Sequence, residues 1–155
     1  MFSVAPSVVI ERLRQALNRH DPAALADCLT TDYVGTHPAH PELDTCGRDA
    51  ACQRWAVTFA CLPDLRADLL RWACADDVVW TEWLFTARAE EGPGYRAGGV
   101  MIFGLADDRL AWVRAYNEPQ PIVGPDWDKA FAEALSGFDN GLGAARDELS
   151  LTQPD

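Results

Sequence analysis

The second half of the chain contains four segments rich in β-branched and aromatic residues, and the links between them are short. The segments are residues 65–74, 78–89, 95–105 and 109–117, and the links are residues 75–77, 91–94 and 107–108. Segments of this composition favour strands. Because a link of a few residues can join only antiparallel neighbours, we expect the four strands to form a meander.

The first half shows the three- and four-residue spacing of helices instead. Helices are expected over residues 7–20, from residue 21 to an end at residues 30–32, and over residues 49–62. Ser7 and Asp21 are the expected N-caps, and Pro63 ends the third helix. A short strand at 33–36 and an irregular loop at 37–47 lie between the second and third helices. This order predicts an α+β domain with three N-terminal helices packed on one antiparallel sheet.

A chain of 155 residues fits one compact unit. We expect residues 1–118 to form a small-molecule-cavity domain. Residues 119–155 are expected to add a C-terminal extension to the same unit, with one helix at 127–136. Trp127 and Phe131 on that helix could cover the cavity mouth, contact a neighbouring subunit or close off a sheet edge, and the sequence leaves these alternatives open.

The charge balance limits the partners of the chain. Thirteen Lys and Arg residues against 24 Asp and Glu residues give a net charge of −11, which repels nucleic acid and anionic membrane surfaces, so neither is expected as a partner. No stretch approaches the ~20 apolar residues that span a bilayer, and we expect no signal peptide. Five irregularly spaced cysteines without a C-x-x-C pair favour a reducing cytoplasm over disulfides or thiolate-bound zinc.

Short motifs mark the order of these elements. They are His20-Asp21-Pro22, Tyr33 with His37-Pro38, residues 47–50, Phe59 with residues 62–65, Glu82-Trp83 and residues 112–117. In this order, over residues 7–119, the chain resembles the nuclear-transport-factor-2-like superfamily, and within it the polyketide-cyclase-like (SnoaL-like) branch. The resemblance implies a strongly bent sheet around a cone-shaped, mostly apolar cavity closed by helices. It leaves the activity open, because members include cyclases, isomerases, hydrolases, dehydratases and non-catalytic binding subunits.

The groups that the resembled enzymes use in catalysis are only partly present here. Their cyclases carry an acid–base Asp near the end of the last strand, where this chain has Asn117, which forms hydrogen bonds but exchanges no proton near neutral pH. Their steroid isomerases carry a protonated Asp on a middle strand, near Val100 in this sequence. Their epoxide hydrolases carry an Arg and an Asp, where Trp83 and Phe85 stand. Each mechanism therefore lacks an essential group.

His37 is the leading candidate for proton transfer. It follows the strand that is expected to enter the cavity, and an unperturbed imidazole titrates near pH ~6.5. The alternative is that His37 only fixes its loop through a backbone hydrogen bond. His37, His40, Glu42 and Asp44 also suggest a metal site. A loop with two prolines does not hold them on one face, so we expect no metal and no other cofactor.

Apolar and aromatic residues are the expected walls of the cavity. The candidates for ligand binding are Tyr33, Trp55, Phe59, Trp83, Phe85 and Val100. Trp55 and Phe59 share the apolar face of the third helix. Trp83 and Phe85 share a face of their strand, so that these four side chains could line one chamber. Core packing alone would produce the same pattern.

The opposite faces of two strands mix aromatic and charged residues. They carry Trp80, Glu82, Leu84, Thr86 and Arg88 on one strand and Trp112, Arg114 and Tyr116 on the other. Mixed faces of this kind are common where sheets pack in symmetric dimers, and the resemblance also implies a dimer. We therefore expect a homodimer through the outer sheet face, and an ion pair between Glu82 and Arg114 could cross that face.

Together these features predict a polyketide-cyclase-like protein with a small-molecule cavity. As an isomerase, cyclase or hydrolase it would act on an apolar substrate by general acid–base chemistry. His37 would move the proton, while Asn117 and Tyr33 would orient a substrate oxygen. The alternative is a non-catalytic ligand-binding or dimeric assembly domain of the same fold. A nuclear transport adaptor would need a partner surface that the sequence does not identify.

Overall fold

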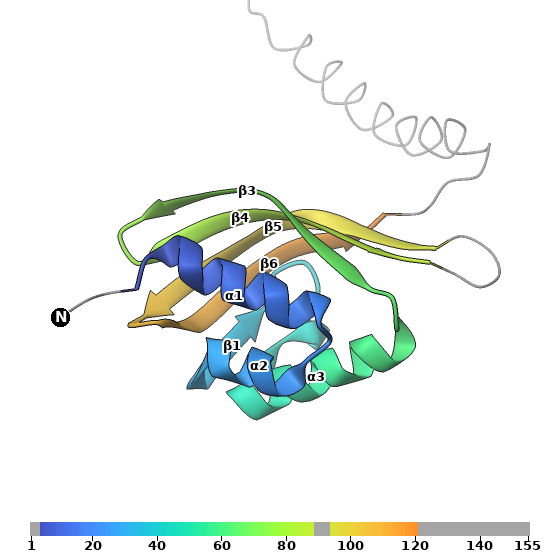
Figure 1. Cartoon of the computed structure of the whole chain (residues 1–155), viewed down its shortest axis with the longest axis horizontal. Coiled ribbons are helices and arrows are strands. Elements are labelled where there is room, and N and C mark those ends of the chain that lie inside the picture. The colour runs from blue at the N-terminus through green and yellow to red at the C-terminus, as the bar shows by residue number, and fades with distance from the viewer. Residues whose placement is uncertain (1–3, 89–93, 121–155) are drawn as a thin grey trace, which may run out of the picture. The chain divides into compact units, whose positions relative to one another are not determined.

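Three helices lie on one side of a six-stranded sheet in the computed structural model, which describes residues 4–88 and 94–120 (Figure 1). The helices are α1 (Pro6–Asn18), α2 (Pro22–Cys28) and α3 (Arg48–Cys61). The strands are β1 (Leu29–Thr36), β2 (Thr45–Cys46), β3 (Arg66–Ala75), β4 (Val78–Ala87), β5 (Tyr95–Ala106) and β6 (Arg109–Pro119), and a 3-10 turn, η1, covers Pro41–Leu43. The strand order is β2-β1-β6-β5-β4-β3.

The expected meander is confirmed, because β3, β4, β5 and β6 pair in sequence and antiparallel. The expectation of an all-antiparallel sheet is wrong, since β1 runs parallel to β6 and makes the sheet mixed. Between β1 and the meander lie β2 and the whole of α3. A connection of that length permits a parallel neighbour, whereas the short links within the meander do not.

The start of α1 and the end of α2 differ from the sequence prediction. Ala5 occupies the N-cap position of α1 and its side chain makes no capping hydrogen bond, so Ser7 is not the cap. Asp21 is confirmed as the cap of α2, because its carboxylate accepts hydrogen bonds from the N–H groups of Ala23 and Ala24 at 3.0 and 3.1 Å. The helix then ends at Cys28, and the next residues, expected to end the helix, begin β1.

The segment expected to be an irregular loop contains strand β2 and the turn η1. The two residues of β2 pair with Val34 and Gly35 of β1. The expected helix at 127–136 lies outside the described residues, as does most of the extension that contains it. None of the helices that the structure describes is long and apolar enough to cross a membrane.

The core fills the space between the helices and the inner face of the sheet. Ile10, Leu13 and Leu17 are buried on α1, as their spacing predicted. Along β4, alternate residues are buried and belong to the inner face. They are Val79, Thr81, Trp83, Phe85 and Ala87. This alternation decides which side chains can reach a cavity beneath the sheet.

Candidate functional site

A pocket of about 200 Å³ opens on the inner face of the sheet, bounded by β1, α3, β5 and β6. Most of its walls are apolar, and several polar groups face it. The lining residues are Tyr33, Gly35, His37, Leu43, Thr45, Ala51, Arg54, Trp55, Thr58, Leu65, Phe85, Tyr95, Ala97, Met101, Val113, Asn117 and Pro119. An apolar concavity with a few polar groups is the usual form of a small-molecule site.

Asn117 lies on the inner face near the end of β6. It pairs across the sheet with Gly99 of β5, which pairs with Trp83 of β4, so all three residues belong to the same face. Gly99 permits a close approach of the strands, since a Cβ there would lie 2.2 Å from the carbonyl oxygen of Tyr116. The Asn117 Oδ1 atom is buried and has no hydrogen-bond partner among the described residues.

His37 directly follows β1 and also lines the pocket. Its backbone N–H donates a hydrogen bond to Asp44 Oδ1 at 2.7 Å, and this contact joins the two ends of the loop 37–44. The imidazole is not needed for that contact. Its Nδ1 lies 3.7 Å from the same oxygen and is buried without a hydrogen-bond partner in the part of the chain that the structure describes. The loop is therefore fixed by the backbone of His37, and no hydrogen bond within the described residues holds its imidazole Nδ1.

Burial is the main reason why the pKa of His37 lies below its ordinary value, and the positive charge of Arg54 adds to the effect. Asp44 acts in the opposite direction but does not reverse the shift. The imidazole is consequently neutral at neutral pH and can accept a proton. Burial also raises the pKa of Tyr33 well above its ordinary value, so its phenol stays protonated and can donate a hydrogen bond.

Arg54 is a pocket residue that the sequence analysis did not single out. It lies on α3 between two other lining residues, three positions after Ala51 and four before Thr58. Its guanidinium donates a hydrogen bond to the backbone carbonyl of Leu43. Helical spacing was the signal that could have found it, because Ala51, Arg54, Trp55 and Thr58 share one face of the helix.

The predicted aromatic residues divide between the pocket and the core. Trp55 and Phe85 line the pocket, with ring centroids 6.0 Å apart. Phe59 does not line it, and stacks on His20 at 4.7 Å behind Trp55. Trp83 faces a separate void of about 20 Å³, which is room for about one water molecule.

The polar end of Trp83 is satisfied within the protein. Its indole Nε1–H donates to Thr81 Oγ1 at 2.7 Å, and that hydroxyl in turn donates to the carbonyl of Met101 at 2.6 Å. Trp83 and Thr81 are 1% and 2% exposed. Trp83 is therefore a core residue with a completed hydrogen bond. It shares the small void with Trp55 but does not line the larger pocket.

Val100 lies on the outer face of the sheet, so the expectation that it contacts a ligand is wrong. It pairs with Glu82 of β4 and Tyr116 of β6, both of which point away from the helices. Side chains alternate along a strand, and a shift of one residue reverses the face. The neighbouring Met101 lines the pocket in its place.

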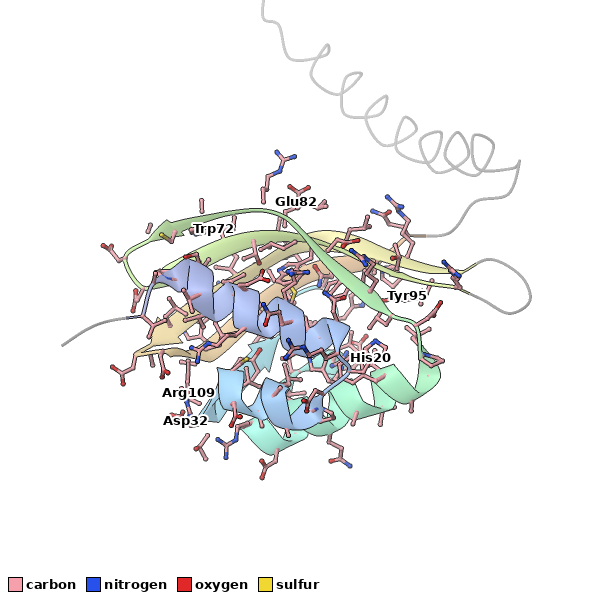
Figure 2. All side chains as sticks on the ribbon, in the orientation of Figure 1. His20, Asp32, Trp72, Glu82, Tyr95 and Arg109 are labelled. Carbon is pink, nitrogen blue, oxygen red and sulfur yellow. The ribbon has the colours of Figure 1, made fainter. Side chains whose placement is uncertain are left out.

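The outer face exposes a group of large apolar side chains. Trp80, Trp112 and Tyr116 are among its exposed residues. Glu82 also lies on this side, away from the helices (Figure 2), and its partner is Arg71 at 2.7 Å rather than the expected Arg114. Because both partners of this ion pair are substantially exposed, it adds little stability.

His40 forms a contact next to the pocket. Its Nε2 lies 3.0 Å from the carboxylate of Glu118, one residue beyond Asn117, and its Nδ1 lies 3.4 Å from Glu42. The hydrogen bond to Glu118 raises the pKa of His40. Among residues 4–88 and 94–120, no three His, Cys, Asp or Glu side chains are grouped as a metal site requires.

Comparisons with known proteins agree with this architecture. A family model for the SnoaL-like domain matches residues 10–113. IdmH of Streptomyces antibioticus, a proposed polyketide cyclase, has a similar structure, with a TM-score of 0.65 and 19% identity, covering 74% of this chain and 93% of that one. A protein of ketosteroid isomerase-like fold from Catenulispora acidiphila, crystallised with trimethylamine, has a TM-score of 0.64 and 16% identity, covering 73% and 86%. No protein of curated function matches the sequence.

Proposed function

Because this chain belongs to the SnoaL-like family, we propose that its pocket takes an apolar small molecule and converts it by general acid–base chemistry. His37 is the group that moves the proton. Tyr33 and Asn117 hold a substrate oxygen, and Trp55 and Phe85 bury the apolar part of the molecule. The reaction class is an isomerisation, cyclisation or hydrolysis.

The observation that carries this proposal is a pair of buried polar atoms without partners in one pocket. His37 Nδ1 and Asn117 Oδ1 both lack a hydrogen-bond partner among the described residues, and both residues line the same space. Buried polar atoms in folded proteins are nearly always paired. Rotation of these two side chains toward the pocket would let a ligand with polar groups supply the missing partners.

The protonation states support the assigned roles. A neutral imidazole can remove a proton from a carbon next to a carbonyl group, and the electron pair of the broken C–H bond moves toward the carbonyl oxygen. The Tyr33 phenol can donate a hydrogen bond to that oxygen as its negative charge develops. Return of the proton to a different carbon completes an isomerisation, while attack of the enolate carbon on a second carbonyl within the substrate closes a ring.

The outer face of the sheet supports a second part of the proposal, a homodimer. Trp80, Trp112 and Tyr116 are 51%, 37% and 44% exposed on this one face. Aromatic residues are enriched in interfaces and charged residues are depleted at their centres. Burial of this face against its copy would remove the three side chains from water.

The test of the catalytic role compares His37→Ala with His40→Ala, which lies in the same loop. His37→Ala keeps the backbone N–H that binds Asp44, so the loop contact is retained. Exchange of the α-protons of cyclohexanone in D₂O, followed by NMR, measures proton abstraction from a ring-sized ketone. We expect His37→Ala to lower the enzyme-dependent rate by about 10²-fold or more, and His40→Ala to leave it near the wild-type value.

An unchanged rate in His37→Ala would remove His37 from the mechanism. The alternative function, a non-catalytic binding domain, is favoured by a different result. In that case the wild-type protein would be stabilised by cyclohexanone in thermal unfolding but would not accelerate the exchange.

A further inference from the structure

We propose that the molecule taken by this pocket is a single-ring carboxylate, with its carboxylate at Arg54 and its ring against Trp55 and Phe85. The inference rests on the proposed function, because it names the substrate class of the same pocket. It goes beyond that function in assigning a charged group to a ligand that the apolar walls alone would leave neutral.

The charge of the pocket walls is opposite to the charge of the protein. The chain has 24 acidic residues and a net charge of −11, yet no Asp or Glu is found among the described residues that line the pocket. Arg54 is the lining residue with a permanent positive charge. Asp44 lies 3.7 Å from His37 Nδ1 but does not line the pocket. The charge among the lining residues is therefore positive, which favours an anionic ligand.

Arg54 has donors left for such a ligand. One guanidinium nitrogen donates to the carbonyl of Leu43, and none of the ion pairs among residues 4–88 and 94–120 includes Arg54. A guanidinium carries five N–H donors in a planar fork, which matches the two oxygens of a carboxylate. Arg54 also lowers the pKa of His37, which indicates that its charge acts within the pocket.

The volume sets the size of the ligand. A dry cavity of about 150 Å³ holds one benzene molecule, and typical ligand sites measure about 300–1,000 Å³. At about 200 Å³, this pocket has room for one ring and a small substituent. The rings of Trp55 and Phe85, 6.0 Å apart, supply a continuous aromatic wall for that ring.

The experiment measures the binding of benzoate and benzyl alcohol, two probes with the same ring and different charge, by calorimetry at neutral pH. The proteins are wild type, Arg54→Gln, Arg54→Lys and the control Arg48→Gln, which changes an arginine of the same helix outside the pocket lining. We expect wild type to bind benzoate about tenfold or more tightly than benzyl alcohol, as one charge-assisted hydrogen bond would give.

Arg54→Gln is expected to lose this preference while its affinity for benzyl alcohol is unchanged, and Arg48→Gln is expected to keep it. Arg54→Lys retains the charge and is expected to keep part of the preference for benzoate. It therefore provides a second test of the inference if Arg54→Gln does not fold. Equal affinity for the two probes in wild type, or a preference that survives in Arg54→Gln, would overturn the inference.

The failure of this inference and the failure of the proposed function give different results. If neither probe binds, the inference is wrong, and cyclohexanone exchange still tests the catalytic proposal independently. If both probes bind equally and His37→Ala abolishes the exchange, the acid–base function stands and only the assignment of a carboxylate falls.

Discussion

The hydrogen bond from Trp83 to Thr81 makes a quantitative prediction about the wall behind the pocket. Thr81→Val keeps the shape of the side chain but removes the acceptor for the indole N–H and the donor to the Met101 carbonyl. The lost hydrogen bond to the Met101 carbonyl costs about 1 kcal/mol net, and the buried indole N–H left unpaired costs ~1–3 kcal/mol. We expect Thr81→Val to lower the free energy of unfolding by about 2–4 kcal/mol, since both residues are almost wholly buried.

A double-mutant cycle separates this hydrogen bond from the packing of the ring. Trp83→Phe removes the N–H together with part of the buried ring, and leaves the Thr81 hydroxyl still donating to the Met101 carbonyl. In Thr81→Val/Trp83→Phe no indole N–H remains to be unpaired. The double variant should therefore lose less stability than the sum of the single variants, by about 1–2 kcal/mol.

The assay is urea unfolding at one pH, in which the midpoint and the slope are compared between the four proteins. Additive losses, or a loss in Thr81→Val below about 0.5 kcal/mol, would refute the reasoning, because the hydrogen bond would then contribute nothing measurable. Benzoate binding supplies a second readout. Trp83 does not line the pocket, so Trp83→Phe should bind benzoate as wild type does.

Two further predictions concern local geometry. Gly99→Ala would bring a Cβ within 2.2 Å of a backbone oxygen of β6, whereas at Gly104 the clash is with the Trp112 ring, which is 37% exposed and can move aside. We expect Gly99→Ala to cost about 3 kcal/mol or more in urea unfolding and Gly104→Ala about 1 kcal/mol, and equal losses would contradict this. Asp21→Ala removes the α2 cap and should cost about 1 kcal/mol in the same assay, while Asp27→Ala, outside the cap, should not.

Elements fixed by local rules could be predicted from the sequence, and elements fixed by distant contacts could not. The short links of the meander and the Asp21 cap act within a few residues, and both predictions are confirmed. The direction of β1 is decided by its pairing with β6, more than 70 residues later in the chain, as in Gly35 with Val113. Strand β2 has only two residues, too few to show any periodicity.

The same difference between local rules and distant contacts limited how well the site residues could be predicted. Val100 follows Ala97, Gly98 and Gly99. This run lacks the contrast between polar and apolar residues that reveals the inner face of a strand. The prediction that Val100 faces the cavity was therefore wrong by one position. Trp83 and Phe85 were placed correctly on one face. Whether a buried aromatic residue lines a pocket or fills the core depends on packing across the sheet, which alternation along one strand does not contain.

The presence of Asn rather than Asp at position 117 is related to the presence of Arg54 in the same pocket. An Asp at position 117, as in the cyclases that the sequence resembles, would place a carboxylate in the same small space as a guanidinium. The two opposite charges would attract each other, which would lower the pKa of the acid and weaken it as a base. With Asn117 the pocket lining instead keeps the positive charge of Arg54, no acidic residue and a neutral imidazole, His37. A base without charge leaves the field of Arg54 free to act on an anionic ligand, so an Asn at position 117 is consistent with the carboxylate that we propose at Arg54.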